Sequence, residues 1–422
     1  MDKGLTRDDY EEVTREYGEH VRKALGSTYL GMSAKWQGED IIIGMSDIDY
    51  RVILTPDAGV DDWIKVDRAC GEIHSALATR CRRWWRVLEH TPGAGLTTDH
   101  LLDDRLYHPE YRFWHVAAGS TDLLDPMNER LESKDWEVRD ELYHLKRFLY
   151  FYSPYQQGID PPINLEGVEA EYDLHSRCWH YFAPAMLSAA SLLAGRGFCG
   201  KKVTLQWLQA EHPRAPIFTK VLDMVAARYE VPERTDRTLR DAFDAEMFAM
   251  FEQLEGPVRE SLRLLSWPAD LDMAAMKQRL PDDPSTGNAR MALTDAVRFA
   301  RIRLGRYLFY LDPPDGFDAV HPLKGEAMWV KVVYGTPLRI GTAALGIAPG
   351  DRSAEEVFAR MLGRALTAPE KAALDAMARL AAMKWSTHDD ARRAFSQICT
   401  VYLDFYRLLE EYADRLFQRL GT

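Results

Sequence analysis

Apolar side chains in the first part of the chain follow a helical period. Between residues 7 and 25 they recur at spacings of three and four positions, at Tyr10, Val13, Tyr17, Val21 and Leu25. This spacing predicts an amphipathic helix. We expect the helix to stop at Gly26, because glycine enters the left-handed region at little cost. A second helix is expected over residues 60–80.

Three short runs have an extended rather than a helical pattern. They are rich in β-branched and aromatic residues and are bounded by turn residues, at Asp47–Leu54, Trp84–His90 and Phe113–Ala118. Such runs are typical of strands. Alternation of strands and helices within residues 1–135 predicts a small α/β or α+β domain.

The pattern changes after residue 136, where strand signals nearly vanish and amphipathic helical spacing dominates. A cluster of Pro, Asp, Ser, Thr and Gly at 281–287 is typical of a linker. We therefore expect an α+β protein with a mixed-sheet domain over 1–135. A helical bundle over 136–280 and a second bundle over 288–422 would follow it.

The two helical halves share short motifs. Residues 147–152 (RFLYFY) precede Asp160-Pro161-Pro162, and residues 306–311 (RYLFYL) precede Asp312-Pro313-Pro314. Tyr181-x-x-Pro184 is likewise matched by Tyr334-x-x-Pro337. We interpret the halves as a diverged repeat. The alternative is a chance match between aromatic-rich helices.

Composition narrows the class of protein. The 422 residues are 46% hydrophobic and 28% charged, as in soluble globular proteins. Five scattered cysteines without a CxxC pair argue against a disulfide framework or a structural zinc site. Neither a signal peptide nor a membrane-spanning stretch is visible. We expect a cytoplasmic protein that does not enter the membrane.

The charge of the chain argues against a nucleic acid as its ligand. The net charge is −12, and residues 1–135 hold 17 Lys and Arg against 26 Asp and Glu. A surface that binds a polymer of phosphates is normally basic. A small molecule is therefore the favoured partner.

Candidate chemistry gathers at Asp47 and Asp49, which lie two positions apart in a predicted strand. Side chains at this spacing project from one face, where two carboxylates repel unless a cation lies between them. Mg²⁺ prefers such oxygen ligands and commonly shares its shell with substrate phosphates. The alternative is a solvated strand end, because this short motif is common.

The surrounding motif resembles a known family. Leu30-Gly31-x-Ser33, followed by Ser46-Asp47-Ile48-Asp49, is similar to the nucleotidyltransferase superfamily of the DNA polymerase beta type. The likeness is greatest to its antibiotic-modifying and minimal branches, and it covers roughly residues 25–205. It implies that the helices after residue 136 form one wall of the active-site cleft.

The resemblance also implies roles for individual residues. Asp47 and Asp49 would bind one or two Mg²⁺ ions. Glu89 would be a third carboxylate that ligates metal or activates the acceptor, with His90 and Asp99 as competitors. The phosphates of a nucleoside triphosphate, for example ATP, would be held by three groups of residues. These are the Gly-x-Ser turn (Gly31 and Ser33), Ser46 before the aspartates, and the basic residues Lys35, Arg51, and Lys201 or Lys202.

The expected reaction is Mg²⁺-dependent transfer of a nucleoside monophosphate to a hydroxyl or other nucleophile of a small molecule, with release of pyrophosphate. An antibiotic or a biosynthetic intermediate would be the acceptor. Met32, which follows Gly31 where the family has serine, leaves a non-catalytic nucleotide-binding or scaffold protein as an alternative. A transferase that acts on a protein or a tRNA is a third reading. Whether the second helical half closes the site or forms a homo-oligomer stays open.

Overall fold

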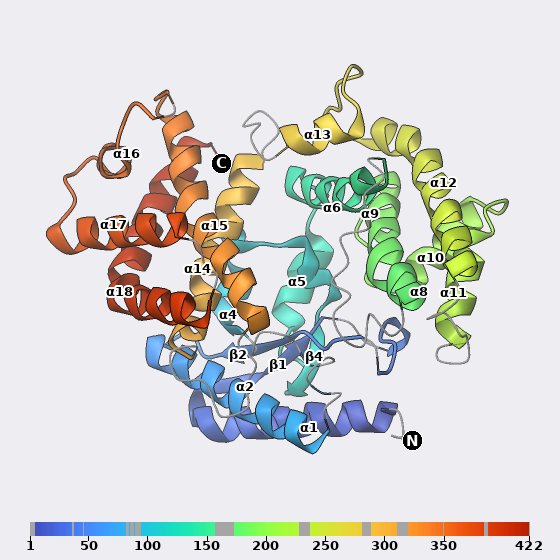
Figure 1. Ribbon diagram of the computed structural model, residues 1–422, viewed down its shortest axis with the longest axis horizontal. Helices are drawn as coiled ribbons and strands as arrows, with labels where there is room; N and C mark the ends of the chain where they lie inside the picture. The colour runs from blue at the N-terminus through green and yellow to red at the C-terminus, as the bar shows by residue number, and fades with distance from the viewer. Residues whose placement is uncertain are drawn as a thin grey trace.

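The computed structural model contains a small mixed sheet surrounded by helices (Figure 1). It is 72% helical, and its four strands lie near the N-terminus, which is an α+β layout. The residues that it describes are 5–35, 38–44, 46–81, 84, 88, 94–156, 173–227, 237–280, 288–309, 320–348, 350–383 and 387–421.

The sheet has the strand order β3-β2-β1-β4. Its members are β1 (Tyr29–Ala34), β2 (Tyr50–Leu54), β3 (Ala94–Thr97) and β4 (His115–Gly119). β1 pairs antiparallel with both β2 and β4, whereas β3 runs parallel to β2. The end of β1 and the starts of β2 and β4 therefore meet at one end of the sheet.

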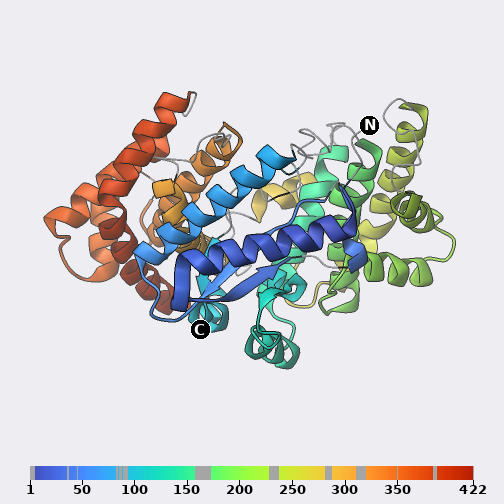
Figure 2. The same ribbon diagram turned by 90° about the horizontal axis from the view of Figure 1, so that it is seen from below.

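Two long helices cover one face of this sheet, α1 (Arg7–Leu25) and α2 (Val60–Arg80), as Figure 2 shows. Both confirm the helices predicted from apolar spacing. Tyr17 of α1 packs on Tyr50 of β2, with ring centroids 4.7 Å apart. Short elements contribute to the core on the other face: α4 (Thr98–Leu102), η3 (Asp104–Leu106), η4 (Pro109–Phe113) and α5 (Asp125–Ser133).

The middle helices form a bundle with its own core. They are α6 (Val138–Gln156), α8 (Asp173–Ser176), the π-helical η5 (Arg177–Phe182), α9 (Ala183–Ala194), α10 (Lys201–Glu211), α11 (Ile217–Ala227), α12 (Arg237–Ser261) and α13 (Met273–Arg279). Phe148, Trp179 and Phe251 are fully buried there. Ile42 and Phe113 from the sheet region join this core, so the bundle is anchored to the sheet.

The last helices lie on the other side of the sheet region from the middle bundle in Figure 1. They are α14 (Asn288–Phe309), α15 (Val320–Ala344), α16 (Ala354–Leu362), α17 (Ala368–Ala382) and α18 (His388–Arg419). α14 packs along α2. Trp63 of α2 and Tyr406 of α18 form an edge-to-face pair with ring centroids 6.4 Å apart. Apolar residues of these helices and of α2 form one continuous core.

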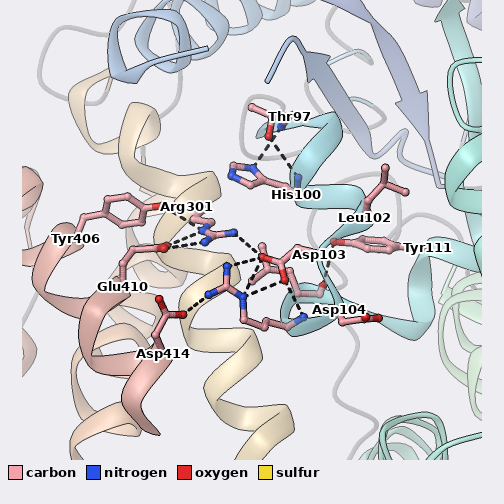
Figure 3. A network of polar contacts seen from close by, with 12 residues as sticks. Thr97, His100, Leu102, Asp103, Asp104, Tyr111, Arg301, Tyr406, Glu410 and Asp414 are labelled. Carbon is pink, nitrogen blue, oxygen red and sulfur yellow. Dashed lines mark hydrogen bonds and ion pairs between the residues drawn. The ribbon is translucent and has the colours of Figure 1, made fainter. Parts of the chain in front are cut away.

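A charged network fixes α14 to the sheet region (Figure 3). Arg301 donates two hydrogen bonds to Glu410 of α18, at 2.7 and 2.8 Å, and lies 3.5 Å from Asp103 beside η3. Its guanidinium group is almost completely buried. Since a charge buried in this way is stable only with partners, Glu410 and Asp103 hold α14 in one place.

The structure differs from the three predicted strands in several places. β1 has no counterpart among them, and β4 begins at His115, because Phe113 lies in η4. β2 begins at Tyr50 rather than Asp47, although Ile48 forms an isolated parallel bridge with Leu88. β3 was not predicted, because its glycine-containing sequence AGLT follows a turn signal. Of the strand predicted over 84–90, only Trp84 and Leu88 are described. The prediction is wrong at Trp84, which is helical and whose carbonyl accepts from the Leu88 amide at 3.1 Å. The 281–287 linker lies outside the described residues. Within the described part of the chain, no helix combines the length and apolar character needed to span a membrane.

Candidate functional site

Asp47 and Asp49 lie just before β2, at the end of the sheet where β1, β2 and β4 meet. Ile48 between them is buried in the core on the α1 side, and the Tyr50 hydroxyl lies 2.7 Å from Thr14 Oγ1 of α1. Alternation along the extended backbone therefore directs Asp47 and Asp49 toward the opposite face. Both side chains are half-buried.

A turn locked by Tyr10 presents the two carboxylates. The Tyr10 hydroxyl donates a hydrogen bond to the Ser46 carbonyl at 3.0 Å and accepts one from the Gly44 amide at 2.9 Å. Ser46 Oγ accepts from the Ile42 amide at 3.0 Å. Ser46, a predicted phosphate contact, thus closes the turn that precedes Asp47.

Ser33 lies on β1 opposite Arg51 of β2, on the same face as the two aspartates. It is fully buried, and its hydroxyl has no hydrogen-bond partner among the residues that the structure describes. A buried hydroxyl without a partner is unusual, since such groups are nearly always satisfied. This makes Ser33 a candidate donor to a bound group at this end of the sheet.

Gly31 lies inside β1 rather than in the turn that the sequence predicts there. It pairs with Ile53 on one side and with Gly119 on the other. A Cβ at this position would lie 2.6 Å from the Ala118 carbonyl oxygen and would collide with Leu123. Close packing of β4, rather than a phosphate-holding bend, explains glycine at this position.

We expect Gly31→Ala to lower the free energy of unfolding by about 2 kcal/mol, because the added methyl group overpacks the β1–β4 contact. Urea denaturation followed by circular dichroism measures this. Gly256→Ala in α12 is the matched control. In the described part of the chain no atom lies within 4 Å of its added Cβ, so this substitution should be neutral or stabilising. Equal stability of wild type and Gly31→Ala would contradict this account.

The segment between β1 and β2 joins the sheet to the middle bundle. The Asp40 carboxylate accepts from the Lys202 amide at 2.9 Å and so caps the first turn of α10. The Trp179 indole donates to the Asp40 carbonyl at 2.8 Å. These bonds hold the N-terminus of α10 beside the end of the sheet that carries Asp47.

Lys201 and Lys202, adjacent candidates in the sequence, have different surroundings. The Lys201 side chain is 3% exposed, and its ammonium lies 5.2 Å from the centre of the Trp179 ring. Burial lowers the pKa of Lys201 to about 8, although Asp40 and Asp47 oppose the shift. Lys202 is half-buried and contributes its backbone amide to Asp40. Lys201 is therefore the lysine whose charge acts beside Asp47.

Two further cations interact with Lys201. Arg147 of α6 and Lys35 at the end of β1 both contribute to lowering the pKa of Lys201. Arg147 Nη1 donates to the Tyr143 hydroxyl at 2.8 Å, and Arg147 Nε is buried with no hydrogen bond to any described residue. Cationic groups from three separate elements thus gather near Asp47.

Glu110, in η4 just before β4, balances part of this charge. It forms an ion pair with Arg298 of α14 and lies 3.7 Å from Lys35 Nζ. Burial alone would raise the pKa of Glu110, but Arg298, His108 and Lys35 hold it well below its ordinary value. Through Glu110, the last helices reach the cations near Asp47.

Sequence reasoning did not identify Asp40, Arg147 or Glu110. Arg147 lies in an aromatic run whose pattern is typical of a buried helix face. The one charged residue in this run was the only local sign that Arg147 could have a functional role. Asp40 and Glu110 lie in short 3-10 segments without a motif. Their positions depend on tertiary packing.

The structure describes only one of the three candidates for the position of the third carboxylate. Glu89 and His90 lie outside the described residues, so the role of Glu89 stays a prediction. Asp99 is exposed in the first turn of α4, directly after β3. Because β3 runs parallel to β2, Asp99 lies at the opposite end of the sheet from Asp47. It is not a partner of Asp47 and Asp49.

The described residues contain no group of three or more His, Cys, Asp or Glu side chains arranged to hold a metal ion. Asp47 and Asp49 still fit Mg²⁺, which needs only one or two protein carboxylates and keeps its other positions for water and phosphate oxygens. Zinc, which takes three or four protein ligands, does not fit this pair.

Comparison with known proteins identified no relative of this chain. No protein-family model, curated protein or solved structure matches this chain. Any functional assignment therefore depends on the residues and on their geometry.

Proposed function

We propose that the protein is a Mg²⁺-dependent nucleotidyltransferase that transfers a nucleoside monophosphate to a small-molecule acceptor. The proposal depends mainly on one juxtaposition. Two carboxylates share a face at the end of the sheet, and the buried Lys201 interacts with Asp47 at the N-terminus of α10. Carboxylates that can hold Mg²⁺ beside buried cations are what a chelated triphosphate requires.

The cations suit a triphosphate. Lys35, which follows β1, and Arg147 of α6 both act on the charge of Lys201 in α10. Burying like charges together is unfavourable unless an anion joins them. A triphosphate would add negative charge beside these cations.

Each residue then has a role in the proposed reaction. Asp47 and Asp49 would hold Mg²⁺, which neutralises charge on the phosphates and on the departing pyrophosphate. Lys201, Lys35 and Arg147 would orient the phosphates, and the Ser33 hydroxyl would donate to one of them. The acceptor oxygen or nitrogen forms a bond to the α-phosphorus, the bond from that phosphorus to the bridging oxygen breaks, and the acceptor proton leaves to a base. Glu89 is the candidate base.

We also infer that the two helical halves arose by duplication. The helices α6, α10, α11 and α12 have counterparts that begin 150 to 153 residues later, namely α14, α16, α17 and α18. α6 packs on α9 as α14 packs on α15, and α9 packs on α12 as α15 packs on α18. Superposition of the halves in an experimental structure tests this inference.

Pyrophosphate release tests the proposed activity. The full chain is incubated with each ribonucleoside triphosphate and Mg²⁺, with and without a panel of hydroxylated and aminated small molecules. Release that requires both Mg²⁺ and an acceptor supports the transferase. Nucleotide binding without release under any condition would favour the scaffold alternative. No binding at all would reject both.

A further inference from the structure

β4 lies at one edge of the sheet, beyond β1. It pairs with β1 on one side, and among the described residues its other side makes no backbone hydrogen bond. A strand edge of this kind presents unpaired N–H and C=O groups, which readily pair with a further strand. The outer edge of β4 is therefore a candidate interaction surface.

A groove follows this edge. It has a volume of about 540 Å³, and all five residues of β4 lie in its wall. α1 forms the other wall, with Glu11, Gly18 and Arg22 among the residues that line it. The groove therefore gives a partner access to the strand edge and to one side of the helix together.

This side of α1 faces away from α2. On the α2 side, Arg80 lies 2.8 Å from Glu16 of α1. Since successive residues turn by about 100° around a helix, Glu11, Gly18 and Arg22 project in nearly the opposite direction. The groove thus lies where the next helix of the layer over the sheet would pack.

Two exposed charges on this side of α1 are complementary to each other. Neither Glu11 nor Arg22 forms an ion pair with a described residue, whereas Arg15 and Glu19 pair with each other at 3.5 Å. Glu11 and Arg22 lie three turns apart on one helix, so they cannot pair within it. In an antiparallel copy of α1 related by a two-fold axis, Glu11 of each chain would lie beside Arg22 of the other.

The position of that axis also suits the strands. It would pass midway between Glu11 and Arg22, about 2 Å along α1 from Gly18. A Cβ at Gly18 would lie 2.9 Å from the Ala118 Cβ, so this part of α1 lies directly over β4. The same axis would therefore pair the two β4 strands antiparallel, close to their Ala117–Ala118 part.

The spacing of the two layers agrees with this arrangement. α1 packs on both β1 and β4. Neighbouring strands are about 4.8 Å apart, so helices that each cover two strands would lie about 10 Å apart across the joined edges. Packed helices are usually separated by about 8–10 Å. One axis can therefore satisfy strand pairing and helix packing together.

We propose that the protein forms a two-fold symmetric dimer in which the β4 edges join the two four-stranded sheets and the α1 helices pack antiparallel. A second copy of the chain then occupies the groove. The inference does not depend on the proposed function. Asp47 and Asp49 project toward the face of the sheet opposite to α1, so the dimer leaves the candidate site open.

Sedimentation-velocity ultracentrifugation of the full chain, from about 1 to 100 μM, measures the association. We expect wild type to dimerise. Glu11→Arg and Arg22→Glu should each weaken the dimer about tenfold or more, because each makes two attractive pairs repulsive. Glu12→Arg and Lys23→Glu, at exposed positions of α1 that do not line the groove, are the matched controls and should leave the dissociation constant unchanged.

Mixing the two single variants gives the sharpest result. In a mixed dimer the introduced arginine of one chain faces the introduced glutamate of the other, and the unchanged Arg22 faces the unchanged Glu11. We therefore expect the mixture to associate about as tightly as wild type, although each variant alone does not. Hydrogen exchange tests the strand pairing, since β4 amides should be more protected at high than at low wild-type concentration.

The possible outcomes are decisive. Wild type that stays monomeric at about 100 μM would overturn the proposal and leave the groove to another protein or a small molecule. A dimer that neither variant weakens, or whose variants do not recover on mixing, has a different interface, which also overturns it. Unprotected β4 amides in the dimer would do the same. The wild-type concentration series and hydrogen exchange remain informative if a variant fails to fold.

Discussion

Replacing both Asp47 and Asp49 with asparagine should lower the rate of pyrophosphate release by about a thousandfold or more, because the metal contributes several kcal/mol to the stabilisation of charge in the transition state. Asparagine keeps the shape of each side chain but removes the charge that attracts Mg²⁺. Nucleotide affinity should also lose its dependence on Mg²⁺. Pyrophosphate release over a series of Mg²⁺ concentrations measures both effects.

The control for this pair is Asp57→Asn, which makes the same substitution at an exposed position after β2 and removes one negative charge there. It should leave the rate unchanged. Circular dichroism melting curves show whether the double variant is folded. If the double variant Asp47→Asn, Asp49→Asn folds and has wild-type activity, these two residues do not form a catalytic metal site.

Lys201→Met should weaken binding of the nucleoside triphosphate by about tenfold to a hundredfold, the range expected when a hydrogen bond from a buried charged donor is lost. Methionine keeps the length of the side chain over the Trp179 ring. Lys23→Met, at an exposed position in α1, should have no effect. Calorimetry at neutral pH compares the three proteins. Equal affinities would show that Lys201 does not contact the phosphates.

Lys201 also gives the ligand-free protein a distinct pH dependence. Its pKa is about 8 when folded and has the ordinary value of 10.5 when unfolded. Between these values the unfolded chain binds more protons, so the contribution of Lys201 to the free energy of unfolding rises with pH. Wild type should therefore gain stability relative to Lys201→Met from about pH 8 to 10.5. Urea denaturation at several pH values measures this difference, and parallel curves would contradict the burial of the charged lysine.

Local pattern was sufficient for much of the fold. The apolar spacing that ends at Gly26 gave the bounds of α1, and the same reasoning gave those of α2. Each helix buries one face against the sheet, which makes its period visible in the sequence. β3 was missed because a four-residue strand with glycine has little pattern of its own.

The candidate site could be predicted only where a motif marks it. Asp47 and Asp49 lie in a short motif, and resemblance to a family directed attention to Lys201. Glu110 and Arg298 meet across 188 residues of chain. The local sequence around Glu110 or Arg298 does not predict this ion pair, because the pair depends on how α14 packs against the sheet region. Gly31 shows the opposite error, since a glycine read as a phosphate-holding turn is explained by close strand packing.

Crystals grown with Mn²⁺ and a non-hydrolysable nucleoside triphosphate analogue give the most direct test of the central claim. Anomalous scattering locates Mn²⁺, which replaces Mg²⁺ at oxygen-ligand sites. We predict an anomalous peak between Asp47 and Asp49, with the phosphates extending toward Lys201 and Ser33. A fully bound analogue whose metal and phosphates lie elsewhere on the protein would contradict the account.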